Sequence, residues 1–121
     1  MSTTISGTSG VTFPDSTSMQ TGQQACKAWV NFNGTGTVAI RDGYNVSSIT
    51  DNGTGDYTVN FTTAMPDANY SAVGLTGRDG GLGERYMSLT DIFSASFRVE
   101  ARNSERTYFD TNLNCVTIFS N

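Results

Sequence analysis

The residues of this chain that could do chemistry are a few carboxylates close together in sequence. Asp51 and Asp56 flank the segment Asn52-Gly53-Thr54-Gly55, and a pair of carboxylates is what a glycoside hydrolase uses. The segment also resembles an oxygen-rich calcium loop, but it lacks the flanking helices and the distal glutamate of that motif. Asp is favoured in turns because it bonds to its own backbone, so we interpret the segment as a turn.

Other residues and motifs that catalysis commonly requires are absent from the sequence. The chain has no histidine, which removes the usual general base, Ser-His and Cys-His nucleophile pairs and histidine metal sites. Cys26 and Cys115 are too few for a structural zinc site, which takes four ligands. Gly81-Leu82-Gly83 is not followed by the Lys-Ser/Thr of a phosphate-binding loop. We therefore predict no enzyme activity, with no catalytic residue, no metal and no cofactor.

The N-terminal residues and the net charge predict the cellular compartment of the chain and the partners it is not expected to bind. Met1-Ser2-Thr3-Thr4 lacks the basic start and apolar core of a secretion signal, so we expect synthesis in a cytoplasm and no export by the general route. No apolar run approaches the ~20 residues of a membrane helix, and a net charge of −4 argues against nucleic acid. We expect Cys26 and Cys115 to be reduced and buried. A disulfide between them stays an alternative.

The elements that position these residues are predicted to be strands. The chain has 121 residues, 36% hydrophobic and 15% charged, which suits one domain of short strands and tight turns. After the Asp51–Asp56 turn, Tyr57, Val59 and Phe61 point one way and Thr58, Asn60 and Thr62 the other, the period of a half-buried strand. The same reasoning predicts strands at 26–32, 37–41, 44–50, 70–76, 86–90, 96–102 and 115–120.

Two hairpins and one central strand follow from this pattern. Short turns link 26–32 to 37–41 and 44–50 to the strand that begins at Tyr57. The segment Val116-Thr117-Ile118-Phe119 is apolar on both faces, so we expect it to be central. No helix is predicted beyond a possible turn at 91–95, and closely spaced turns indicate a sandwich or barrel. The alternation predicts that eight apolar side chains point into the core: Ala28, Val30, Phe32, Val38, Ile40, Phe97, Val99 and Ala101.

Residues 1–24 differ from the rest of the chain. They are mostly Ser, Thr, Gly and Gln, and such a segment cannot build a core. We predict an extended N-terminal arm at 1–24, either a flexible tail or ordered against a partner, and a folded domain at 25–121. Pro14-Asp15-Ser16 is predicted to be a turn. The apolar anchors of the arm are Ile5, Val11, Phe13 and Met19.

Exposed loops and rings are the candidate binding features. Residues 77–84 form the longest irregular piece and are expected to be an exposed loop. Five of the six arginines follow Gly77; a positive patch is possible there, but ordinary ion pairs are the favoured interpretation. Trp29, Tyr44 and Tyr108 have the apolar face and polar edge that stack on sugars, although core or subunit-interface packing is favoured for them.

The amino-acid sequences of several segments resemble those of one protein family. The stretch from Ala25 to Gly36, followed by Ile49 to Phe61, resembles a domain of tail fibre and virion structural proteins in tailed phages, cyanophages and other aquatic phages above all. Residues 9–15 are similar to a Gly-Val-Thr-Phe-Pro-Asp-Gly segment that often precedes it, with Ser16 in place of the last glycine. Residues 63–70, 96–99 and 116–119 also fit. The resemblance implies an antiparallel β-sandwich, jelly-roll-like and usually homotrimeric, built into the virion, without catalytic residues.

From this resemblance we expect a virion structural protein, a trimeric tail fibre or tail-tip component that contributes to host attachment. Because the chain begins at Met1, we expect a short free-standing fibre or tip. Alternatives are a capsid decoration protein and a carbohydrate-binding module. We expect homotrimer contacts through the Thr58, Asn60 and Thr62 face. The expected attachment arm to other virion proteins uses Ile5, Val11, Phe13 and Pro14. The expected receptor-facing loops, with a host surface glycan as a possible partner, use Arg78, Asp79, Leu82, Glu84, Arg85, Arg106 and Tyr108.

Overall fold

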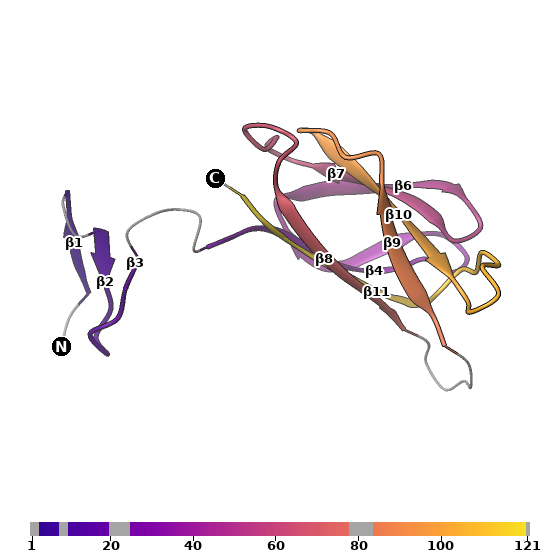
Figure 1. The fold of residues 1–121 in the computed structure, drawn as a ribbon, viewed down its shortest axis with the longest axis horizontal. Coiled ribbons are helices and arrows are strands. Elements are labelled where there is room, and N and C mark those ends of the chain that lie inside the picture. The colour runs from indigo at the N-terminus through magenta and orange to yellow at the C-terminus, as the bar shows by residue number, and fades with distance from the viewer. Residues whose placement is uncertain (1–2, 8–9, 20–24, 78–83, 121) are drawn as a thin grey trace.

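The structure is a computed structural model that describes residues 3–7, 10–19, 25–77 and 84–120. Eleven strands and no helix lie in these residues, so the all-β prediction is confirmed (Figure 1). None of the described residues belongs to a helix long and apolar enough to cross a membrane. The strands of the folded part are β4 (Cys26–Asn33), β5 (Ala39–Tyr44), β6 (Val46–Gly53), β7 (Asp56–Phe61), β8 (Ser71–Gly77), β9 (Tyr86–Thr90), β10 (Ser96–Arg102) and β11 (Leu113–Phe119).

Two four-stranded antiparallel sheets make up the folded part, with the orders β5-β4-β11-β8 and β6-β7-β10-β9. Both predicted hairpins are confirmed, since β4 pairs with β5 and β6 pairs with β7. The central position of the last strand is also confirmed, because β11 lies between β4 and β8. The predicted strands at 86–90 and 96–102 match β9 and β10, whereas β5 begins two residues later than predicted because Thr37 and Val38 belong to the preceding turn.

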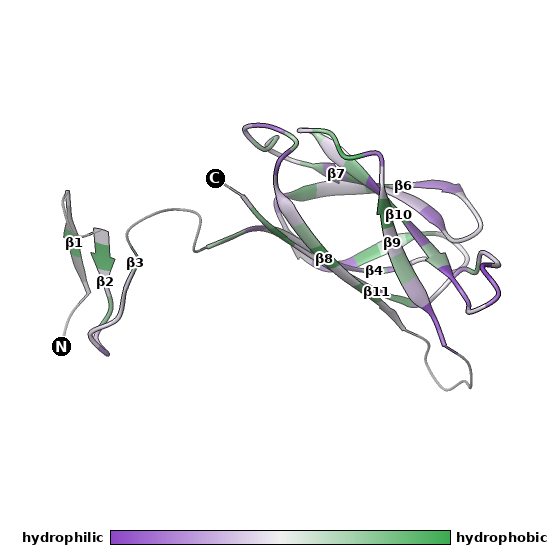
Figure 2. Ribbon diagram, viewed as in Figure 1, coloured by the Kyte–Doolittle hydropathy of each residue, from purple (hydrophilic) through white to green (hydrophobic). Residues whose placement is uncertain are grey.

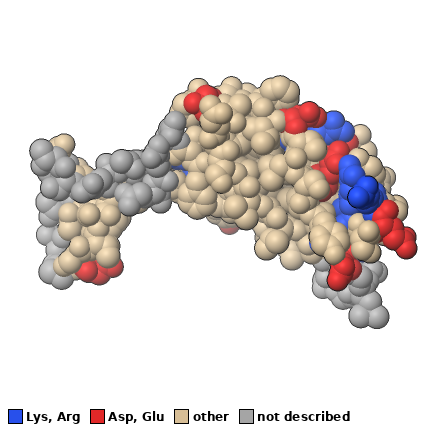
Figure 3. Space-filling model, in the orientation of Figure 1, with Lys and Arg blue, Asp and Glu red and all other residues tan. Residues whose placement is uncertain are grey.

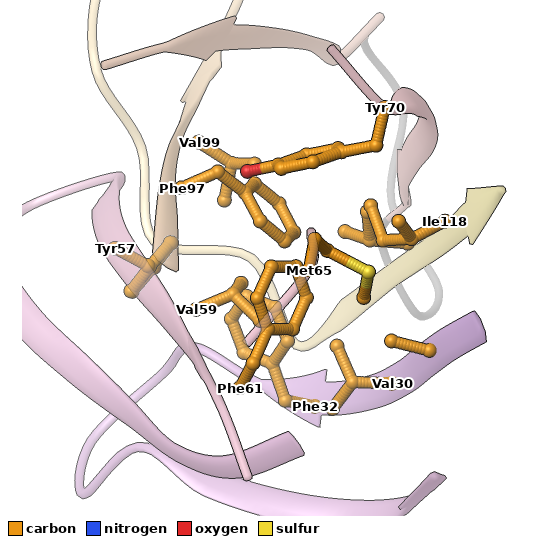
Figure 4. Packing of buried hydrophobic residues seen from close by; sticks show 12 residues of the cluster. Val30, Phe32, Tyr57, Val59, Phe61, Met65, Tyr70, Phe97, Val99 and Ile118 are labelled. Atoms are coloured by element: carbon orange, nitrogen blue, oxygen red, sulfur yellow. The ribbon is translucent and has the colours of Figure 1, made fainter. Parts of the chain in front are cut away.

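The alternation places one face of each sheet in a shared core (Figure 4). Each sheet contributes its inward side chains, such as Phe32 from β4 and Val59 from β7, both fully buried. Phe61 lies with its ring centroid 5.5 Å from that of Phe97 and 5.7 Å from that of Tyr70, distances at which aromatic pairs attract. Val38 and Ile40, predicted to point inward, pack only partly buried against the core, because Ile40 lies on the edge strand β5 and Val38 in the turn before it.

A buried hydroxyl fixes one end of the two sheets. The oxygen of Tyr57 lies 2.9 Å from Asp110 Oδ1 and 3.0 Å from the carbonyl oxygen of Gly34. The same Asp110 oxygen accepts the backbone N–H of Gly55 at 2.9 Å. A Cβ at Gly34 would stand 2.3 Å from the Tyr57 hydroxyl, so only glycine fits there. Burial and the Asp110 carboxylate raise the pKa of Tyr57 well above its usual range, and the hydroxyl stays a donor.

Residues 4–19 contain three strands that the sequence did not predict. These are β1 (Thr4–Ser6), β2 (Gly10–Thr12) and β3 (Ser18–Met19), and they form a small antiparallel sheet that lies apart from the larger sheets in Figure 1. The predicted turn at Pro14-Asp15-Ser16 is present, since Ser16 N–H donates to Phe13 O at 3.0 Å and Asp15 Oδ1 accepts Thr17 N–H. The described part of residues 1–24 is therefore paired and not a single extended segment. Period-two reasoning missed it because strands of two or three residues are too short to show a pattern.

The cysteines lie on neighbouring strands but cannot pair. Cys115 is opposite Asn31 in the β11–β4 ladder, and Cys26 is opposite Phe119. Four residue steps along a strand separate them by about 13 Å, while a disulfide needs Cα atoms about 4.4–6.8 Å apart. Both are free thiols, and both are partly exposed. The expected full burial is therefore wrong, because both side chains point to the outward face of their sheet.

The Tyr57 hydroxyl provides a first prediction. Tyr57→Phe keeps the ring in the core and removes the donor, leaving the buried Gly34 carbonyl without its partner. We expect the free energy of unfolding to fall by about 1–2 kcal/mol, measured by urea denaturation. Tyr44→Phe is the control, because the Tyr44 ring is 59% exposed and its loss should change little. Equal stabilities of Tyr57→Phe and the parent protein would contradict this role.

Candidate functional site

Three connections between strands that the structure describes converge at one end of the two larger sheets, which we call the distal end. They join β4 to β5, β6 to β7 and β10 to β11. Backbone contacts hold them together: Gly34 N–H donates to Thr111 O at 2.9 Å, and Ala101 N–H donates to Gly55 O at 2.7 Å. The small N-terminal sheet lies at the opposite end of the molecule (Figure 1). Loops on a rigid scaffold are where proteins commonly place binding residues.

The distal end is also the charged and hydrophilic end. Figure 3 shows basic and acidic side chains gathered there, and Figure 2 shows hydrophilic residues in the same loops. The arginines are interleaved with carboxylates. Arg98 forms an ion pair with Asp56, and Arg102 forms one with Glu100. The ion-pair interpretation is therefore confirmed for these two arginines.

Two tyrosines flank one arginine on this surface. Arg102 faces Tyr86 across the β10–β9 ladder and makes an isolated bridge to Tyr108 on its other side. Its guanidinium carbon lies 4.4 Å from the centroid of the Tyr108 ring, and its Nη2 donates to the Tyr108 hydroxyl at 2.6 Å. Tyr86 is 50% exposed and Tyr108 39% exposed. The row Tyr86–Arg102–Tyr108 therefore presents two partly exposed tyrosine rings, one of which packs under the Arg102 guanidinium.

A shallow groove of about 330 Å³ runs beside this row. Its lining is polar except for the tyrosine ring and consists of Tyr86, Ser88, Arg102, Asn103, Ser104 and Arg106. We call it the distal groove. Its loop is rigid because Asn103 Oδ1 accepts the backbone N–H of Glu105 at 3.0 Å and of Thr107 at 2.9 Å. Arg106 occupies a left-handed backbone position, with φ of 66°, so the chain reverses there and its side chain lines the groove.

The structure brings together only part of the predicted recognition residues. Arg106 lines the distal groove, and Tyr108 belongs to the tyrosine row beside it. Glu84 and Arg85 precede β9 at the same end, with the Arg85 guanidinium carbon 4.5 Å from the centroid of the Phe109 ring. Arg78, Asp79 and Leu82 lie outside the described residues.

Sequence reasoning missed Tyr86, Arg102 and Asn103. The signal for Arg102 was available, because the alternation in 96–102 directs every arginine of that strand outward. Nothing in the sequence, however, pairs Arg102 with Tyr86 or Tyr108. That pairing comes from the strand register.

The surface has the chemistry of a binding site. Ring faces, a guanidinium, an amide and hydroxyls around a shallow groove match the apolar face and polar edges of a saccharide. Among the described residues no group of three or more Cys, Asp or Glu side chains could hold a metal ion. The turn predicted at residues 51–56 is confirmed only at Thr54 and Gly55, because β6 continues to Gly53 and β7 begins at Asp56. Asp51 Oδ1 accepts Gly53 N–H in this hairpin.

Comparison with known proteins yields no relative: no family model matches the chain, and no curated protein or solved structure matches it. The two antiparallel sheets around one core define an all-β protein.

A second groove, of about 340 Å³, lies on the outward face of the β6-β7-β10-β9 sheet around the Asp56–Arg98 pair. Arg98 Nε donates to Asp56 Oδ1 at 2.7 Å, and Arg98 Nη1 also approaches Asp91 at 3.2 Å. These hydrogen bonds from Arg98 hold the pKa of Asp56 below its usual range. Asp56 therefore stays ionised and engaged and is unsuited to act as a general acid.

The Asp56–Arg98 pair predicts a pH-dependent stability. A folded-state pKa below the unfolded value stabilises the protein fully above about pH 4, the unfolded value. This stabilisation is lost as the pH falls through the folded value. Asp56→Asn should therefore lower Tm by a few degrees at neutral pH, and the difference from the parent protein should shrink in acid, as measured by thermal unfolding at several pH values. In an Arg98→Gln background the same change should have a smaller effect; equal effects in both backgrounds would show that the pair is not coupled.

Proposed function

We propose that this chain is a structural protein of a phage particle, a homotrimeric component of the tail fibre or tail tip that contributes to host attachment. The observation that carries the proposal is the division of the molecule into two ends. A small separate sheet lies at one end, and loops bearing tyrosines and arginines converge at the other. Such a division suits a protein that docks by one end and presents the other.

The N-terminal sheet supports a docking role. Its strands have only two or three residues each, and sheets this small are marginal without a partner surface. Ile5 is 82% exposed and Phe13 38% exposed, while Val11 is half-buried and Pro14 is exposed beside the turn. We infer that another virion protein covers these apolar side chains.

The distal groove supports a recognition role. Tyrosine and arginine are the residues that contribute most to binding hot spots, and here they are fixed by strand pairing and by the Asn103 turn. A rigid site loses little entropy on binding. We propose that the groove takes a sugar of a host surface glycan, with the Tyr86 and Tyr108 rings stacking on it.

A capsid decoration protein is the second candidate. The exposed Ile5 and Phe13 fit a capsid surface as well as a fibre shaft, because both are apolar anchors without charge selectivity. In that case residues 4–19 would dock on the head, and the folded part would add stability to it. A free carbohydrate-binding module is the third candidate and needs only the distal groove.

Immunogold electron microscopy of phage particles distinguishes these candidates. Antibody against the folded part should label the tail or its tip. Label confined to the head would overturn the tail assignment in favour of decoration. Particles without any label would overturn the virion assignment itself.

Glycan binding is tested with the protein displayed at many copies on beads, because avidity raises weak single-site binding. The displayed protein should bind a subset of glycans on an array. Tyr86→Ala and Tyr108→Ala should each weaken that binding about tenfold, since a ring stack contributes roughly 1–1.5 kcal/mol. Phe93→Ala is the matched control, because Phe93 is 60% exposed and lies outside the distal groove. Equal loss for Phe93→Ala and the two tyrosine variants would contradict the assignment.

A further inference from the structure

The outward face of the β5-β4-β11-β8 sheet is unusually apolar. On β8 the exposed positions include Val73, 60% exposed, and Leu75, 76% exposed. Aromatic and aliphatic side chains on the other three strands continue the surface. We call this surface the apolar face and define it by Trp29, Tyr44, Val73, Leu75, Leu113 and Phe119.

Strand register makes the apolar face continuous. Val73, Thr117 and Trp29 form one row across β8, β11 and β4, and Tyr44 on β5 extends it. Leu75 begins the next row, opposite Cys115. Directly opposed side chains in neighbouring strands have Cβ atoms about 4.5–5.5 Å apart and touch. A contiguous apolar surface of this kind on a soluble protein marks an interaction site.

The opposite outward face, on the β6-β7-β10-β9 sheet, does not compete for this role. Asn60 Nδ2 donates to Ser48 Oγ at 3.1 Å and to Thr50 Oγ1 at 3.0 Å. Asn52 Nδ2 donates to Thr58 Oγ1 at 2.8 Å. Thr58 and Asn60, which were expected to form subunit contacts, thus already bond to side chains of β6 within one chain, which leaves less for a second copy.

The charge of the apolar face fits a copy of the same chain. Among the outward positions of β4, β8 and β11, Lys27 alone is charged, and the edge strand β5 carries the exposed pair Arg41 and Asp42, which have opposite charges. The chain as a whole carries −4, so two copies repel each other through their charged surfaces. They meet with least repulsion through this face, because the residues that define it carry no charge.

The shape of the apolar face is self-complementary. A hollow of about 370 Å³ lies over β4 and β11, lined in part by Cys26, Trp29, Asn31 and Cys115. Leu75 stands beside it on β8, one strand away from Cys115, and its large exposure shows that it protrudes. A surface that carries a knob next to a hollow can receive the knob of one copy and insert its own into another, as heterologous interfaces do.

We propose that copies of this chain associate through the apolar face, with Leu75 of one copy seated in the Cys115 hollow of the next. The same contact passed from copy to copy closes into a ring of three. This inference names the contact surface of the proposed homotrimer. It rests on the proposed function only for the number of copies in the assembly. Its test uses purified protein, so its outcome does not depend on where the protein lies in a particle.

Light scattering coupled to gel filtration, on the full chain over a wide range of concentration, tests the proposal. The parent protein should have three times the monomer mass of 12.9 kDa. Leu75→Glu should reduce it to the monomer, because an unpaired carboxylate would enter the hollow. Circular dichroism confirms that the variant is folded, which we expect since Leu75 is the most exposed residue of the face.

Two matched variants test whether a different surface of the protein mediates the association. Asn60→Glu tests the polar face, and Ile5→Asp tests the N-terminal sheet as the element that covers a neighbour; both should keep the mass of the parent protein. A parent protein that stays monomeric would overturn the proposal. So would a monomer produced by Asn60→Glu or Ile5→Asp while Leu75→Glu still associates.

Cys115 gives an independent measurement in the parent protein. It is partly exposed in a single chain and lies within the hollow, so association should slow its reaction with a maleimide. The reaction should be several-fold faster in Leu75→Glu, as followed by mass spectrometry of the modified peptide. Equal rates in the two proteins would contradict burial of the hollow between copies.

Discussion

The buried Tyr57 hydroxyl is the contact on which the distal end depends. The ring of Tyr57 packs in the core, and its hydroxyl oxygen reaches the loops. This oxygen lies within hydrogen-bonding distance of Asp110 and of the Gly34 carbonyl. Asp110 in turn accepts the N–H of Gly55. One side chain therefore joins the β4–β5 turn, the β6–β7 turn and the β10–β11 loop to the core. Because the β10–β11 loop carries Arg106 and Tyr108, the geometry of the distal groove follows from this contact.

A second buried network reinforces the same end. Asn114 is fully buried on β11, and its Oδ1 accepts the hydroxyls of Thr111 at 2.6 Å and Thr76 at 2.8 Å. Its Nδ2 donates to the Thr111 carbonyl at 2.9 Å. A satisfied buried amide fixes its neighbours because any shift leaves polar atoms unpaired. The loop from residue 103 to 112 is thus held at Asn103, Asp110 and Thr111, and its ring-bearing residues project from a rigid base.

The inward half of this fold could be predicted from the sequence, and the outward half could not. Alternation alone identified Val59 and Phe97 as core residues, since period two is a property of a single strand. The apolar face depends on which strands are neighbours: Trp29 and Val73 become part of one row only through Thr117. The distal groove likewise needs the register that sets Arg102 beside Tyr86. Single-strand patterns carry no information on such pairings between distant segments.

The two outward faces of the larger sheets differ in how they meet water. The face around Asp56 and Asn60 satisfies its hydrogen bonds internally and remains compatible with water. The face around Trp29 and Leu75 exposes apolar area that water does not solvate favourably. Association through the second face would leave the first face and the distal loops open to solvent. The small apolar thiol of Cys115 in the hollow leaves room for a leucine. A larger side chain at this position would fill the space that we assign to Leu75 of the next copy.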